Sequence, residues 1–112
     1  TGESHFHGGI DIAAPLNTEV LAARDGIVLR LGYDEVLGNY IVLAHEGGYQ
    51  TIYGHLHSTN VQLNQAVYSG MIIARIGNTG LSTGVHLHFE IRKAGQTRDP
   101  FELLIKGAYE RE

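Results

Sequence analysis

The 112-residue chain contains no cysteine and no tryptophan, and it has only two prolines beside fifteen glycines. Without cysteine the chain forms neither a disulfide nor a thiolate zinc site, so a metal site has to be built from histidine, aspartate or glutamate. No run of about 18 apolar residues occurs, and no membrane-spanning helix is therefore predicted. A signal peptide is not recognisable either.

Positive charge is also scarce. Eight lysines and arginines stand against twelve aspartates and glutamates, for a net charge of -4 at pH 7. This balance argues against nucleic acid or an anionic membrane as the main partner. The length corresponds to one domain that can bury a core. Because the chain opens at Thr1 without a methionine, we expect residues 1–112 to be a single domain of a longer protein, with a further segment before it.

The abundant glycine indicates a mainly β fold. Short runs of valine, isoleucine, leucine and tyrosine between glycines are typical of strands joined by tight turns. Strands are predicted over residues 9–13, 19–24, 26–33, 39–45, 49–56, 71–76 and 85–91. The dipeptide Asp25-Gly26 predicts a hairpin between the second and third of these strands. One short C-terminal helix is predicted from the cap Asp99 and Pro100 to Gly107.

The segment Val-His-Leu-His-Phe-Glu-Ile over residues 85–91 alternates strictly between apolar and polar residues. In a strand this pattern turns the apolar side chains to a core and places His86, His88 and Glu90 on the other face. The two imidazoles are then about 7 Å apart along the strand. Taken alone, the segment is equally consistent with the solvated face of an edge strand. Glu90 is consistent either with a group that orients a ligand histidine or with a surface salt bridge.

Further polar residues share a face within, or directly before, two other predicted strands. His7 and Asp11 have the same parity and could meet at one point, although a glycine turn with a surface aspartate is the alternative. On the strand at 49–56, alternation places His55 and Tyr53 opposite Ile52 and hence away from the core. Tyr53 is considered as a possible contact with substrate.

The other histidines are given ordinary structural interpretations. His5 and His45 are predicted to lie at the surface. His57 is interpreted as a loop residue, the alternative being a group at the rim of a site.

Two histidines and one carboxylate suit a catalytic zinc ion, which keeps three protein ligands and leaves its fourth position to water. His7, Asp11 and His88 supply this set, and we expect one Zn2+ per chain. With only one carboxylate the zinc remains a Lewis acid and lowers the pKa of its water towards about 7. His55 and His86 are then available to handle protons.

Three motifs of the chain occur in one order: His7-x-x-x-Asp11, Tyr53-Gly54-His55-Leu56 and His86-Leu87-His88-Phe89-Glu90. Together they resemble the signatures of the lysostaphin-type, LytM-like zinc metallopeptidases. Gly-Asn-Tyr at 38–40 and Asn-Thr-Gly-Leu-Ser-Thr-Gly at 78–84 are similar as well, so that the resemblance runs from about His5 to Pro100. Each motif alone is weak evidence, whereas all three in order are specific.

The resemblance implies an antiparallel β-sheet with an active-site groove. It implies zinc ligands at His7, Asp11 and His88, and catalytic histidines that bind no metal at His55 and His86. Members hydrolyse stem or bridge peptides of bacterial peptidoglycan outside the cytoplasm. This chain departs from the family where Val85 replaces a usual proline, and it starts after a customary Gly-x-Arg turn.

The expected reaction is metal-assisted amide hydrolysis, in which the individual roles of His55 and His86 stay open. One alternative is a non-catalytic LytM-like module that binds and activates another cell-wall hydrolase. A second is a closed structural zinc site in an interaction domain. Neither the bond cleaved nor the oligomeric state follows from the sequence.

Overall fold

The computed structural model describes residues 9–82, 84–93 and 96–98, the last three by their backbone alone. The strands are β1 (Gly9–Ala13), β2 (Glu19–Leu21), β3 (Gly26–Asp34), β4 (Gly38–Ala44), β5 (Tyr49–Thr59), β6 (Ala66–Val67), β7 (Ile72–Ile76), β8 (His86–Lys93) and β9 (Gln96–Arg98), and a 3-10 turn, η1, covers Glu46–Gly48. The mainly β prediction is confirmed. The helix predicted from Asp99 lies outside the described residues. Within the described ranges there is no helix whose length and apolar character would let it cross a membrane.

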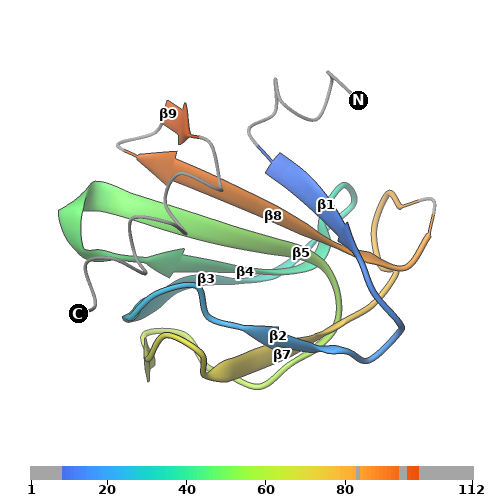
Figure 1. The fold of residues 1–112 in the computed structure, drawn as a ribbon, viewed down its shortest axis with the longest axis horizontal. Coiled ribbons are helices and arrows are strands. Elements are labelled where there is room, and N and C mark those ends of the chain that lie inside the picture. Colours follow the sequence, from blue (N-terminus) through green and yellow to red (C-terminus); the bar gives the residue numbers. More distant parts are fainter. Residues whose placement is uncertain (1–8, 83, 94–95, 99–112) are drawn as a thin grey trace.

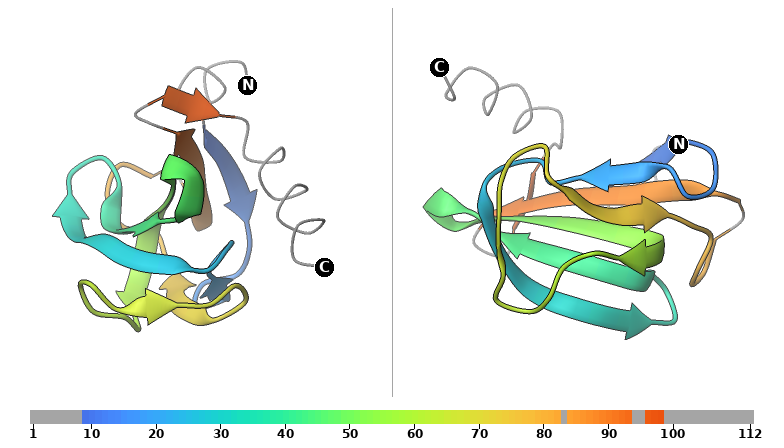
Figure 2. Two further views of the ribbon diagram at one scale, coloured as in Figure 1. Left: turned by 90° about the vertical axis from the view of Figure 1, so that its left-hand side faces the viewer. Right: turned by 90° about the horizontal axis from the view of Figure 1, so that it is seen from below.

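The strands form one antiparallel sheet that curls back on itself. Its order is β1-β8-β5-β4-β3-β6, while β7 pairs with both β5 and β2, and β9 pairs with β8. Figure 1 shows β1, β8, β5 and β4 side by side, with β2 and β7 beneath them. The two turned views in Figure 2 show the curl that brings these parts into two layers.

The hydrophobic core lies inside this curl and draws side chains from both layers. Fully buried members include Val28 of β3, Leu43 of β4, Ile73 of β7 and Ile91 of β8. Removing apolar surface of this kind from water stabilises a fold by about 25 cal/mol per Å². The alternation predicted for β8 is confirmed, because its apolar side chains join the core and its histidines do not.

The hairpin predicted at Asp25-Gly26 is wrong. β2 pairs with β7, whereas β3 pairs with β4 and β6. Gly26 is not among the residues with positive φ. A Cβ at this position would overlap the carbonyl oxygen of Ala44 and lie 2.7 Å from Nδ1 of His45. The glycine therefore permits close approach of β4 and does not form a turn.

His45 is a buried residue and not the surface residue that the sequence predicted. Its Nδ1 donates to the carbonyl oxygen of Asp25 at 2.8 Å, and its Nε2 accepts from the Thr51 hydroxyl at 2.7 Å. The Thr51 hydroxyl is also hydrogen-bonded to the Tyr53 hydroxyl at 2.9 Å, and this in turn accepts from the amide of Ala23 at 3.0 Å. This chain of hydrogen bonds satisfies polar groups in the core. It links β5 to Ala23 and Asp25, which lie between β2 and β3, and to His45, which follows β4.

The face predicted for Tyr53 is also wrong. Its side chain is 1% exposed, and its ring packs against Phe89 of the core with centroids 5.3 Å apart. Burial raises the pKa of Tyr53 to about 12, so its hydroxyl stays protonated. Tyr53 is therefore a core residue and not part of the face that carries the histidines of β8.

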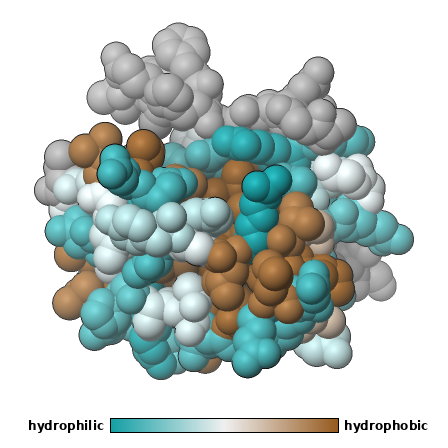
Figure 3. Space-filling view, turned by 180° about the vertical axis from the view of Figure 1, so that it is seen from behind, coloured by the Kyte–Doolittle hydropathy of each residue, from teal (hydrophilic) through white to brown (hydrophobic). Residues whose placement is uncertain are grey.

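Apolar side chains also gather on the face opposite to the view of Figure 1, as Figure 3 shows. Large apolar residues with exposed side chains include Leu21 and Ile72, which are cross-strand neighbours, and Ile27 and Leu29 of β3. Monomeric domains commonly carry one apolar patch, so this surface by itself assigns no partner.

Candidate active site

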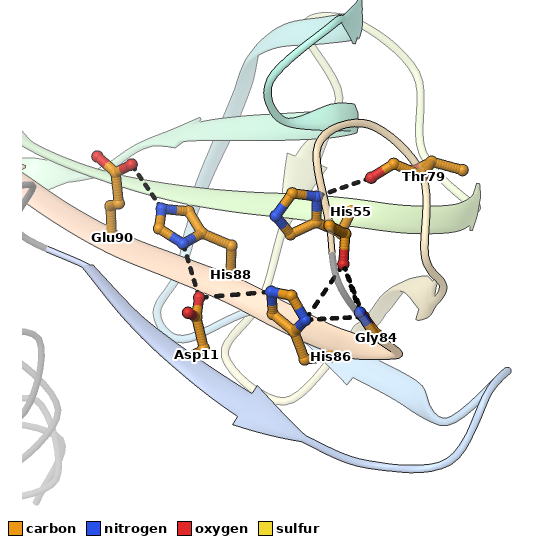
Figure 4. A network of polar contacts seen from close by, with 8 residues as sticks. Asp11, His55, Thr79, Gly84, His86, His88 and Glu90 are labelled. Atoms are coloured by element: carbon orange, nitrogen blue, oxygen red, sulfur yellow. Dashed lines mark hydrogen bonds and ion pairs between the residues drawn. The ribbon is translucent and has the colours of Figure 1, made fainter. Parts of the chain in front are cut away.

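The register between β1 and β8 brings the predicted site residues of these two strands together. Asp11 lies opposite His88, and Ala13 lies opposite His86. Directly opposed residues project to the same face. Accordingly, Oδ1 of Asp11 is 2.9 Å from Nδ1 of His88 and 3.6 Å from Nε2 of His86 (Figure 4). The carboxylate of Asp11 thus lies between two imidazoles.

The second nitrogen of His88 is held by Glu90, which is 6% exposed. Nε2 of His88 lies 2.7 Å from Oε2 of Glu90, while Arg92 donates to Oε1. The hydrogen bond with Glu90 raises the pKa of His88, against the opposing effect of burial. Burial alone would raise the pKa of Glu90, but the hydrogen bond from His88 and the charge of Arg92 outweigh it, and the pKa lies below its usual value. Glu90 is therefore an ionised carboxylate at neutral pH.

His55 reaches the same face through an unusual backbone conformation. In β5, Gly54 lies opposite His88 and Tyr53 opposite Phe89, so simple alternation would send the next side chain, His55, into the core. His55 instead has a φ of 61°, and its amide donates to the carbonyl oxygen of Leu37 at 2.5 Å. This left-handed residue reverses the alternation. The His55 ring consequently lies 4.7 Å from that of His86 and 6.0 Å from that of His88, centroid to centroid.

Backbone carbonyls set the tautomers of the two predicted catalytic histidines. Nδ1 of His55 donates to the carbonyl oxygen of Thr79 at 2.7 Å, and Nδ1 of His86 donates to that of Gly84 at 2.9 Å. In its neutral form each ring then carries its lone pair on Nε2. Burial lowers the pKa of His55, although the Thr79 carbonyl acts in the opposite direction. His55 is thus available as a neutral proton acceptor.

Thr79 lies in the loop between β7 and β8, and hydrogen bonds anchor this loop. From the sequence, the segment was notable only for its similarity to the family. The Thr79 hydroxyl donates to the carbonyl oxygen of Leu56 at 2.7 Å and accepts from the amide of Asn39 at 3.1 Å. Gly38 and Gly80, both with positive φ, approach so closely that a Cβ on Gly80 would overlap the amide nitrogen of Gly38. The close approach of these two glycines therefore helps to place the Thr79 carbonyl that accepts from His55.

The donors of Asp11 and His88 fit a zinc ion. A carboxylate oxygen and an imidazole nitrogen face one another, and the other nitrogen of His88 contacts a carboxylate, as is usual for a metal-ligating histidine. Within the described ranges, no group of three or more side chains that could hold a metal is assembled. His7, the predicted third ligand, lies outside those ranges.

Comparison with known proteins decides the family. The sequence model of Peptidase family M23 matches residues 5–100. The chain belongs to this family. The predicted resemblance to lysostaphin-type peptidases is thereby confirmed, and the motif histidines lie within an M23 domain.

Curated relatives of this M23 chain include named peptidoglycan hydrolases. The peptidoglycan DD-endopeptidase ShyC of Vibrio cholerae is 38% identical over 100 residues, which are 89% of this chain and 23% of that protein. The DD-carboxypeptidase/endopeptidase Mpg of Neisseria gonorrhoeae is 39% identical over 100 residues, with the same shares of 89% and 23%. The chain thus spans about a quarter of the length of these relatives.

Solved structures confirm the fold. The catalytic domain of lysostaphin from Staphylococcus simulans has a TM-score of 0.84 at 32% identity, covering 88% of this chain and 79% of that one. LytU has a TM-score of 0.83 at 38% identity, covering 89% and 73%. A zinc-containing peptidase from Vibrio cholerae has a TM-score of 0.80 at 39% identity, covering 83% and 29%.

Proposed function

We propose that this M23 domain, taken as one unit over residues 1–112, is a zinc-dependent endopeptidase. It hydrolyses stem or bridge peptides that cross-link bacterial peptidoglycan, and it acts outside the cytoplasm. The observation that carries the proposal is the carboxylate of Asp11 between His86 and His88, with the His55 ring beside His86. The named activities of the relatives support the substrate class.

The zinc ligands in this proposal are His7, Asp11 and His88, with one Zn2+ per chain. When bound, zinc would supply Lewis acidity towards a peptide carbonyl and would lower the pKa of a water molecule. The donor types agree with this role, because imidazole and carboxylate are ordinary ligands of catalytic zinc.

His55 and His86 are the proposed proton-handling residues. The Thr79 and Gly84 carbonyls keep a proton on Nδ1 of each ring, so Nε2 is the atom that can accept a proton or return it to the leaving amine. Nε2 of His86 lies 3.6 Å from Oδ1 of Asp11, and this carboxylate would stabilise positive charge on the ring. No carboxylate general base is required in this arrangement.

The test is hydrolysis of purified peptidoglycan by the zinc-loaded protein, with products identified by mass spectrometry. The parent protein is expected to release cleaved peptides whose masses identify the bond. His55→Ala is expected to lose at least about a hundredfold in rate, the lower range for a positioned acid–base group. His57→Ala is the matched control, because His57 lies on the same strand and is exposed. If the zinc-loaded parent releases nothing, the endopeptidase proposal fails and the non-catalytic module is favoured.

A further inference from the structure

His88 lies between two carboxylates, one at each ring nitrogen. Nδ1 is 2.9 Å from Oδ1 of Asp11, and Nε2 is 2.7 Å from Oε2 of Glu90 (Figure 4). A neutral imidazole has one N–H donor and one lone pair, and a histidine that binds a metal must present the lone pair. Which carboxylate receives the proton therefore decides which nitrogen faces the metal.

Glu90 uses its two oxygens for two different donors. Arg92 donates from Nε and Nη2 to Oε1, at 3.2 and 3.0 Å, and arginine has no acceptor to offer in exchange. Oε2 is left to His88. Because Glu90 is buried, an unsatisfied oxygen would be costly, and this favours a proton on Nε2 of His88.

Gly9 supplies the space for this contact from the neighbouring strand. It lies opposite Glu90 in the β1–β8 register. A Cβ on Gly9 would stand 2.7 Å from Cε1 and 2.9 Å from Nε2 of His88, and 2.9 Å from Cγ of Glu90. These distances are shorter than van der Waals contact, so the space that a Cβ would need is taken by the His88 ring and the Cγ of Glu90.

We propose that Glu90 is a positioning residue of the metal centre, which accepts the Nε2 proton of His88 and so directs the Nδ1 lone pair to the metal beside Asp11. Arg92 holds Glu90 in place by occupying its other oxygen. The inference rests on the proposed zinc site, but it concerns metal affinity and tautomer and not the hydrolytic step.

Glu90→Gln tests the proposal with little change of shape. A glutamine has one oxygen and one NH2 group, whereas Arg92 and His88 both need an acceptor at this position. If the NH2 group faces His88, it favours the lone pair on Nε2 and the proton on Nδ1, where the metal should bind. The zinc dissociation constant, measured by competition with a chromophoric chelator, is expected to rise about 10- to 100-fold.

Removing Arg92 should rescue this variant. In the double variant Glu90→Gln/Arg92→Ala the glutamine is free to turn its oxygen to His88, and zinc affinity should recover by at least about twofold. Arg92→Ala alone should change affinity by less than about fivefold, because its ion pair is partly exposed. Glu19→Gln is the matched control, since Glu19 pairs with Arg75 at an exposed site and should leave zinc affinity unchanged. Circular dichroism verifies that each variant is folded.

The tautomer is measured independently on the parent protein. In the zinc-loaded, 15N-labelled protein, the imidazole NMR signals of His88 should show the proton on Nε2 and the lone pair on Nδ1. This measurement needs no substitution and is decisive even if Glu90→Gln does not fold.

The outcomes separate the inference from the proposed function. A proton on Nδ1, unchanged zinc affinity in folded Glu90→Gln, or a double variant no better than Glu90→Gln overturns the role of Glu90. If the parent binds zinc with the expected tautomer but does not hydrolyse peptidoglycan, the proposed function fails and the positioning role stands. If the parent does not bind zinc, both are overturned.

Discussion

His86 and His88 are two positions apart on one face of β8, yet their nitrogens meet different partners. His86 donates from Nδ1 to a backbone carbonyl, whereas Nδ1 of His88 faces Asp11. His86→Ala should retain nearly one zinc per chain but lose at least about a hundredfold in turnover. His88→Ala should lose zinc and turnover together. The measurement is zinc content and peptidoglycan hydrolysis of both variants at one pH. If the His86 variant lacks metal and the His88 variant keeps it, the assignment of His88 as the zinc ligand is reversed.

Tyr53 offers a second prediction for a single residue. Tyr53→Phe removes the hydroxyl that accepts from the Ala23 amide and is hydrogen-bonded to Thr51. Since the site is buried, the free energy of unfolding in urea should fall by about 1–3 kcal/mol. Tyr33→Phe is the control, because Tyr33 is 63% exposed, and its effect should stay within about 0.5 kcal/mol. Equal effects of the two substitutions would contradict the buried network.

Among the larger elements, the loop between β7 and β8 determines how His55 is held. Gly80→Ala places a Cβ against the backbone of Gly38 at a φ of +77°, whereas Gly70→Ala meets nothing within 4 Å at a φ of +86°. In both variants the left-handed alanine should lower the free energy of unfolding by about 1–2 kcal/mol. Only Gly80→Ala should also displace the Thr79 carbonyl and lower the hydrolysis rate. Urea denaturation and the rate assay give the two readouts, and equal rates in the two variants would count against this support for His55.

The packing of β3, β4 and β5 around His45 predicts a dependence of stability on pH. Burial lowers the pKa of His45 below 6.5 in the folded state, although the bond to Asp25 acts in the opposite direction. The unfolded chain therefore binds a proton at a higher pH than the folded one, and stability falls as the pH drops below about 6.5. The loss is at most about 1.4 kcal/mol per pH unit.

This dependence is isolated by comparison with His45→Gln, which offers a donor to Asp25 and an acceptor to Thr51 but does not titrate. In metal-free protein between about pH 8 and pH 5 the parent should lose more stability than the variant. Parallel curves for the two proteins would show that His45 is not the titrating group.

For the whole molecule, zinc should act as a ligand of the folded state. A ligand that binds only the folded state adds about 2.7 kcal/mol at a concentration 100 times its dissociation constant. After removal of metal by a chelator, added zinc should therefore raise the melting temperature of the parent and of His57→Ala by several degrees. His88→Ala should show no such rise. A parent protein that melts at the same temperature with and without zinc would be inconsistent with the proposed site.

Local pattern was sufficient for the parts of the molecule that depend on neighbours in sequence. The alternation at 85–91 predicted which side of β8 enters the core, because side chains of a strand point to opposite faces in turn. Ligand chemistry and the order of the three motifs predicted the M23 family and the residues proposed for its site. Asp11, His55, His86 and His88 are indeed brought together.

Tertiary contacts decided the features that local pattern placed wrongly or left open. The phase of β5 reverses at His55 because the carbonyl of Leu37, distant in sequence, holds its backbone in a left-handed conformation. Gly26 permits the close approach of Ala44 and does not form a hairpin turn. Whether Glu90 forms a surface salt bridge or contacts His88 depends on its burial between strands. The sequence of one strand does not determine that burial. The amino-acid sequence by itself determined the chemical groups and their alternation, whereas strand pairing determined which of them face one another.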